Sequence, residues 1–315
     1  MRIRALPGTP AFMEAYQAAI ATAAAAPVRQ ADAAKKGSFR HLCVRYYASA
    51  AYKALDISTR NWQRRALDGI AAEHGTKPVA MMQPRHVRKM RDAKVETPAA
   101  ANQLVKALRA LFSWANEAEE TTVNPTVGVK KLKYRSDGHH TWTDEEIGRY
   151  YDRHPLGSQA RLALDLLRYT TGRREDAPRL GRQHVRDGRI RFRQAKNEHR
   201  NPIDIDIPMH AALAESIAAA NVSGKMTFLL TEFGKPFTAN GFGNKFKDWC
   251  RQADLPHCSA HGIRKATLTA LAEAGATPHE IMAIGGHQSL EEVERYTKTA
   301  NRKKTADAAM AKLGG

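Results

Sequence analysis

The chain has 315 residues, enough for two domains of ordinary size that each bury a hydrophobic core. Its 50 lysines and arginines against 32 acidic residues give a net charge of +18, which favours a polyanionic partner. Three cysteines are too few for a disulfide framework, and no apolar run reaches membrane-spanning length. We therefore expect a cytoplasmic protein without membrane partners.

The N-terminal half of the chain is expected to be helical. Residues 1–37 are predicted to be an extension, in which a helix after Pro10 is followed by the polar, linker-like run QADAAKKGS. Residues 38–120 are predicted to form a helical domain, because apolar residues in ANQLVKALRALFSWANEAEE recur at three- and four-residue steps. This pattern is typical of an amphipathic helix in a bundle.

Residues 121–142 are predicted to link two domains. They interrupt the helical periodicity with an Asn-Pro pair, two glycines and the basic run KKLKYR. The positive charge of this run suits a segment that follows a phosphate backbone.

A second domain is predicted over residues 143–302. Thr143 and Glu146 have the spacing of a capping box before a helix at 144–153, and another helix is expected to start after Ser158. An Asp-Gly turn at 187–188 is followed by two alternating segments, RIRFRQA and IDIDIP, which predict antiparallel strands. The expected fold class is therefore mainly α with a small antiparallel β-sheet.

Four more helices are expected after this sheet. Their signals are an apolar stripe at Phe242, Phe246 and Trp249, a second stripe after Ile263, and capping boxes at 277–280 and 289–292. The last of these boxes starts the helix that carries Tyr296. Residues 303–315 predict a short tail helix with an apolar face.

Four side chains near the C-terminus have chemistry that suits phosphoryl transfer. His261 and Arg264 begin one helix, and His287 lies nine residues before Tyr296. A tyrosine phenol is a poor nucleophile near neutral pH, and the phosphorane that it would form requires fixed donors on its oxygens. The guanidinium and the two imidazoles are such donors.

These residues stand in a pattern that resembles the C-terminal signature of the tyrosine recombinase, or phage integrase, family. The resemblance rests on HGIRKATLTALAEAG, IGGH and VERYTK in this order, covers residues 39 to about 300, and is strongest after residue 160. It implies a helical core-binding domain of the SAM-like type followed by a tyrosine-recombinase catalytic domain. An N-terminal arm-binding domain of the integrase kind is not evident.

The family pattern also implies an upstream arginine and a lysine. In YTTGRREDAPRL, the distance from the Thr-Gly pair selects Arg174, whereas the distance to Asp176 selects Arg173. Neighbouring helical side chains diverge by about 100°, so only one can face the phosphate. We prefer Arg173, because the acidic residue is its expected orienting partner. The resemblance makes Lys196, at the end of a predicted strand, the general acid.

The resemblance implies a site-specific recombinase that cleaves double-stranded DNA through a 3′-phosphotyrosine, with Arg173, Lys196, His261, Arg264, His287 and Tyr296 as catalytic residues. ATP, metal and organic cofactors are not required for this reaction. The expected assembly is a homotetramer on paired DNA sites, to which accessory DNA-bending or directionality factors can be added. Alternatives are a type IB topoisomerase-like nicking and closing enzyme and a catalytically silent DNA-binding protein.

Metal chemistry is the remaining alternative. His257, Cys258 and His261 are closely spaced, but paired Cys-x-x-Cys ligands of a structural zinc site are absent. Asp204 and Asp206 share one strand face and do not form the cluster that a two-magnesium nuclease uses. The sequence therefore favours metal-independent chemistry.

Overall fold

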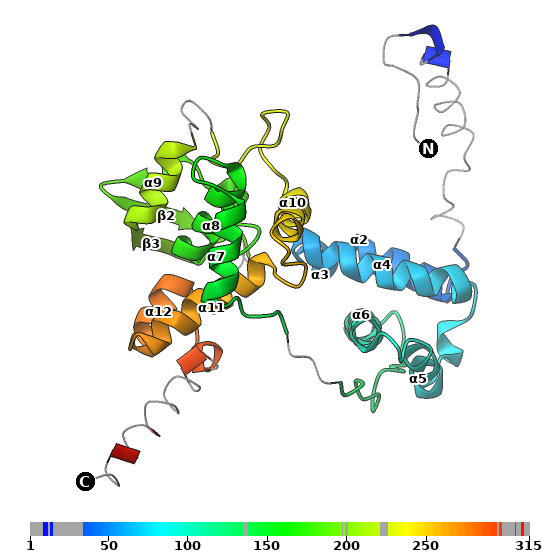
Figure 1. Cartoon of the computed structure of the whole chain (residues 1–315). Helices are drawn as coiled ribbons and strands as arrows, with labels where there is room; N and C mark the ends of the chain where they lie inside the picture. The colour runs from blue at the N-terminus through cyan, green and yellow to red at the C-terminus, as the bar shows by residue number, and fades with distance from the viewer. Residues whose placement is uncertain are drawn as a thin grey trace. The chain divides into compact units, whose positions relative to one another are not determined.

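The computed structural model describes residues 9–11, 13–14, 34–134, 138–196, 198, 201–220, 226–294, 296–297, 306 and 310–311. Two compact units are formed, Met1–Arg135 and Ser136–Gly315 (Figure 1). Most of the predicted extension at 1–37 and of the predicted tail helix at 303–315 lies outside the described residues. Within these residues, no helix has both the length and the apolar character needed to cross a membrane.

The first unit is helical, as its periodicity predicts. Its helices are α2 Phe39–Ala48, α3 Ala50–Lys53, α4 Ile57–His74, α5 Pro84–Asp92 and α6 Pro98–Glu117, with a 3₁₀ turn at Val79–Met81. Proline in the first turn of α5 and of α6 suits the helix start, where the backbone N–H has no partner within the helix. The predicted apolar stripe of α6 is fully buried in the core of this unit at Leu108, Leu111 and Phe112.

The two ends of the predicted linker pack onto the units. Val129 is 1% exposed in the core of the first unit, and Asn102 of α6 exchanges hydrogen bonds of 2.8 and 2.9 Å with the backbone of Leu132. Trp142 is buried in the core of the second unit, where its Nε1 donates to the backbone oxygen of Ser259 at 2.9 Å. Apolar and amide side chains therefore attach most of this segment to one unit or the other.

The second unit combines helices with a small sheet. Its helices are α7 Asp144–Arg153, α8 Gln159–Thr170, α9 Ala211–Ala219, α10 Ala239–Gln252, α11 Ala260–Glu273 and α12 Pro278–Gly285, and its strands are β1 Val185–Arg186, β2 Arg189–Arg193 and β3 Asp204–Pro208. Short 3₁₀ turns lie at Ala177–Arg179 and Arg182–His184. The capping boxes predicted at Thr143 and Thr277 are present, and Ser158 caps α8.

The sheet is antiparallel with the order β1-β2-β3. Asp187 and Gly188 both have positive φ, 51° and 69°, and connect β1 to β2 in the predicted tight turn. Two strands were evident as alternating segments, and the two-residue β1 is an additional strand. The alternation of β2 and β3 is confirmed, because Phe192 pairs with Ile205 on the buried face.

Helix α8 lies at the centre of the second unit. Five of its residues are completely buried, namely Leu162, Ala163, Leu164, Leu166 and Leu167. It packs against α9, α10 and α11. This packing brings the C-terminal end of α8 close to the residues of α11, and the candidate site forms there.

Candidate active site

Arg264 is buried at the centre of the site. It lies on α11, whose N-terminus is capped by Ser259, and is only 4% exposed. Its guanidinium donates hydrogen bonds to the backbone oxygens of Thr171 and Gly285. Burial, and after it the charge of Arg173, lower the pKa of Arg264 to about 10. Arg264 therefore keeps its proton near neutral pH.

Arg173 follows the C-terminus of α8. The helix ends at Thr171 in the left-handed conformation, with φ of 48°, which turns the chain toward α11. The guanidinium of Arg173 donates to Oε1 of Gln194. The buried carboxylate of Asp176 accepts from the backbone N–H of Arg173 at 2.8 Å and of Ala195 at 2.7 Å. Asp176 thus joins the segment of Arg173 to the segment that leads to Lys196.

Arg174 extends in a different direction. A Cβ atom placed on Gly243 of α10 would lie 2.8 Å from Cδ of Arg174, so this side chain lies along α10. Arg174 is exposed, whereas Arg173 is half-buried beside Gln194. Of the two adjacent arginines, Arg173 is therefore the one whose charge acts on Arg264.

His287 directly follows Gly286, the residue at which the end of α12 lies close to the sheet. Gly286 has a φ of 61°, and a Cβ there would lie 2.6 Å from Nε2 of Gln194 and 2.8 Å from Cδ1 of Ile205. A glycine is required by both the conformation and the space. Gln194 Nε2 donates to the backbone oxygen of Gly285 at 3.2 Å. This contact fixes the turn from which His287 reaches Arg264, with 3.3 Å between Nε2 and Nη2.

Tyr296 completes a group that it forms with Arg173, Arg264 and His287, called here the inner group. Residues 290–294 and 296–297 are helical, and Tyr296 is 7% exposed beside Val293 and Ile281. Its ring centroid lies 5.9 Å from that of His287. The phenol is also close enough to Arg264 to act on the pKa of that guanidinium. Arg173, Arg264, His287 and Tyr296 therefore lie in one site, although 123 positions separate the first from the last in the sequence.

His261 and Lys196 are exposed. His261 lies in the first turn of α11, and its ring centroid is 4.6 Å from that of His139. Lys196 lies three residues beyond the end of β2, rather than at the strand end as predicted. The backbone of Gln194 still donates to Ile203 at 2.9 Å, but the backbone N–H of Ala195 donates to Asp176 instead, so strand pairing ends before Lys196.

Asp176 and Glu292 act electrostatically on Arg264 and raise its pKa, against the larger effects of burial and of Arg173. Among the residues that the structure describes, none forms an ion pair with the guanidinium of Arg173 or Arg264. The exposed arginines of the sheet, in contrast, do form ion pairs with carboxylates. Arg193 pairs with Asp204 at 2.8 Å, and Arg189 and Arg191 pair with Asp206 at 2.6 and 3.0 Å. Both aspartates of β3 are thus engaged by arginines. The inner cations are thus available to an anionic group.

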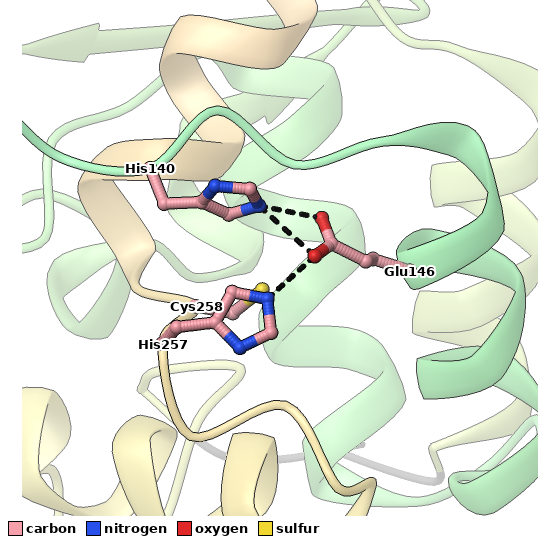
Figure 2. A group of neighbouring side chains, drawn as sticks. All are labelled: His140, Glu146, His257 and Cys258. Atoms are coloured by element: carbon pink, nitrogen blue, oxygen red, sulfur yellow. Dashed lines mark hydrogen bonds and ion pairs between the residues drawn. The ribbon is translucent and has the colours of Figure 1, made fainter.

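A second polar cluster was missed in the sequence. His140, Glu146, His257 and Cys258 bring their donor atoms within 4.8 Å of one another (Figure 2). Burial raises the pKa of Glu146, but hydrogen bonds from His257, the Thr143 backbone and His140 outweigh it and hold the pKa at about 2. Glu146 was recognised only as a capping residue, and the close spacing of His257 and Cys258 had been considered together with His261, which is not a member of this cluster.

Comparisons with known proteins agree with this geometry. A model of the phage integrase family matches residues 144–303, just over half of the chain. A lambda integrase fragment, solved as a dimer bound to a COC′ core site, is 17% identical with a TM-score of 0.73, covering 82% of this chain and 95% of its own. Among curated proteins, no match is found.

Two further solved structures are similar. A lambda integrase tetramer bound to a Holliday junction is 18% identical with a TM-score of 0.72, covering 91% of this chain and 86% of its own. The Tn1549 transposon integrase in complex with transposon right end DNA is 16% identical with a TM-score of 0.70, covering 86% and 99%. At this identity the likeness shows the shared fold.

Proposed function

The chain belongs to the phage integrase family, and on this premise we propose that it is a site-specific DNA recombinase that acts through a 3′-phosphotyrosine intermediate. One observation carries the proposal. Arg264 lies close enough to the buried Tyr296 and to Arg173 for both to act on its pKa, and among the described residues neither guanidinium forms an ion pair with a carboxylate. A DNA phosphodiester supplies the negative charge that relieves the repulsion between the two guanidiniums.

Cleavage is proposed to begin with attack of the Tyr296 hydroxyl oxygen on phosphorus. The phosphorus–O5′ bond breaks as the phosphorus–Oη bond forms, and a 5′-hydroxyl leaves. Arg173 and Arg264 bind the non-bridging oxygens, where negative charge increases in the transition state. His261 donates to the phosphate or accepts the phenol proton, and His287 holds a non-bridging oxygen or the tyrosine.

Lys196 is proposed to give a proton to the leaving O5′ atom. A compact ammonium on a flexible stem suits this role, and the exposed position of Lys196 leaves it accessible to DNA. The 5′-hydroxyl of a partner strand then attacks the phosphotyrosine, which restores the phenol and joins the new strands. The phosphodiester bond energy is retained in the phosphotyrosine, so these steps consume no ATP and include no cofactor.

Recombination requires two duplexes, and we propose that four copies of the chain assemble on paired sites. The lambda integrase neighbour was solved as a tetramer on a Holliday junction. The predicted tail helix at 303–315 is the proposed element of exchange between neighbouring copies, and accessory DNA-bending or directionality factors remain proposed partners.

The proposal is tested by recovering DNA that the full-length protein binds covalently. Supercoiled plasmid carrying a randomised insert library is incubated with the protein, the reaction is stopped with detergent, and protein-linked DNA is sequenced. A recombinase should yield adducts at one recurrent sequence. Relaxation of the plasmid without any preferred sequence would instead indicate a topoisomerase-like enzyme, and the absence of adducts would indicate a DNA-binding protein without catalysis.

A further inference from the structure

Four side chains from three segments point their donor atoms toward one centre (Figure 2). His140 lies on the segment before α7, Glu146 in the first turn of α7, and His257 and Cys258 in the loop before α11. Nε2 of His140 lies 2.8 and 2.9 Å from the two carboxylate oxygens of Glu146, and Nε2 of His257 lies 2.6 Å from one of them. Both imidazoles thus present the same kind of nitrogen to the centre.

This set of donors has the chemistry of a zinc ligand set. Two neutral imidazoles, one carboxylate and one thiolate give four ligands of the types that Zn²⁺ binds in tetrahedral sites. The two anionic ligands balance the charge of the ion. Magnesium and calcium prefer oxygen ligands only, so the nitrogen and sulfur atoms select against them. Ligands about 2.0 to 2.3 Å from an ion require only a small separation of the carboxylate and imidazoles from their present positions.

The surroundings already hold the ligands in place. Oε2 of Glu146 accepts from the Thr143 backbone at 2.8 Å, and the nearby Trp142 Nε1 donates to Ser259 at 2.9 Å. A Cβ on Gly262 would lie 2.1 Å from the backbone oxygen of His140, so glycine permits this segment to lie against α11. Partners of this kind orient metal ligands in known sites.

The burial pattern gives an ion a route from solvent. Glu146 is 7% and Cys258 2% exposed, and together they form the inner side of the cluster. The side chains of His140 and His257 are 39% and 48% exposed and form the outer side. An ion can therefore reach the carboxylate and thiol between the two imidazoles.

We propose that His140, Glu146, His257 and Cys258 form a structural Zn²⁺ site that joins the segment before α7 to the start of α11. This zinc site is linked to the active site through His139, which is adjacent to His140 and whose ring lies against that of His261. The ion takes no part in the proposed chemical steps. It fixes the segment that contacts one of the proposed catalytic histidines.

The test uses full-length protein purified without a histidine tag and freed of metal by a chelator. Titration with Co²⁺ should give one equivalent of a tetrahedral complex with visible bands and a sulfur-to-cobalt charge-transfer band, and Zn²⁺ should displace it. Binding should slow amide exchange of residues 139–142 and 257–262. A wild-type protein that binds no stoichiometric Co²⁺ or Zn²⁺ would overturn the proposal.

Two ligand variants and two controls identify the site. Cys258→Ser should lose the charge-transfer band. Both this variant and His257→Gln should weaken Co²⁺ binding at least about 100-fold, more than is typical for loss of a residue that only hydrogen-bonds to a ligand. The controls are Cys250→Ala, a buried cysteine outside the cluster, and His279→Gln, an exposed histidine on α12. Circular dichroism of each metal-free variant checks folding. Equal affinity in ligand and control variants would place the ion elsewhere.

Discussion

Arg264 and His287 contact each other, with 3.3 Å between Nη2 of the guanidinium and Nε2 of the imidazole. Arginine has hydrogen-bond donors only, so Nε2 of His287 must accept. The contact therefore corresponds to the tautomer of His287 in which Nδ1 carries the proton. His287 and Arg264 thus form one hydrogen-bonded pair beside Tyr296, whose ring centroid lies 5.9 Å from that of His287.

Tyr296→Phe should abolish covalent attachment to DNA and leave site binding unchanged. The substitution removes one hydroxyl from a ring that remains packed against Val293 and Ile281. Denaturing electrophoresis of a nicked suicide substrate, together with a binding assay on the same DNA, measures both properties. An adduct as abundant as that of the wild type would show that another residue is the nucleophile.

Arg173→Ala should reduce the single-turnover cleavage rate by about 10² to 10³, which is typical for loss of a charged transition-state donor. Arg174→Ala is the matched control and should have a milder effect, because its side chain lies along α10 beside Gly243. Quenched-flow or manual time courses with saturating enzyme measure the cleavage rates of both variants. The reverse ranking would assign the catalytic role to Arg174.

Lys196→Ala should lose cleavage on ordinary DNA and recover it on a substrate whose 5′ bridging oxygen is sulfur. A thiolate leaves without a proton, so a missing general acid no longer limits the rate. The comparison uses both substrates with wild type and variant under identical conditions. If the variant has the same defect on both substrates, Lys196 is not the general acid.

Gly286→Ala should destabilise the second unit more than Gly188→Ala. Both glycines have positive φ, 61° and 69°, which costs an alanine about 1 to 2 kcal/mol. Only at Gly286 does the new Cβ meet Gln194 and Ile205, and overpacking adds about 1 to 3 kcal/mol. Free energies of unfolding from urea titrations measure the difference, and equal losses would mean that the contact with the sheet relaxes without cost.

Acid should destabilise the second unit through His154. Burial lowers the pKa of this histidine below its usual 6.5, while its ring nitrogen lies 3.0 Å from the Trp249 backbone oxygen. The folded state then binds fewer protons than the unfolded state below pH 6.5. Stability is fully present above that pH and decreases as the pH falls toward the folded pKa, by at most about 1.4 kcal/mol per pH unit.

Urea unfolding at pH 7.5, 6.5 and 5.5 measures this contribution. His154→Gln should have a shallower dependence on pH than the wild type, and the exposed His279→Gln should keep the wild-type slope. An unchanged slope in His154→Gln would assign the acid sensitivity to another group, such as His184, whose pKa burial also lowers.

The sequence by itself determined the fold class and the family. These features depend on residues that are close together in the sequence. Examples are the capping boxes at Thr143 and Thr277, the Asp-Gly turn and the alternating isoleucines of β3. The four reactive residues near the C-terminus were also recognisable, since their spacing along the chain is itself the family signature. Their catalytic roles remain predictions.

Only the tertiary structure decided how distant segments meet. The sequence contained two conflicting distances for Arg173 and Arg174, and the structure places Arg173 beside Gln194, where its charge acts on Arg264. The link from Asp176 to Ala195 and the approach of Gly286 to Gln194 join residues that are not neighbours in the sequence.

The cluster at Glu146 has the same origin. His257 lies 111 positions from Glu146, and a spacing of this length has no recognisable period. The packing of α7 and of the loop before α11 around the buried Trp142 brings these side chains together. Short-range patterns fix helices, turns and strands, whereas long-range packing determines which side chains share a site.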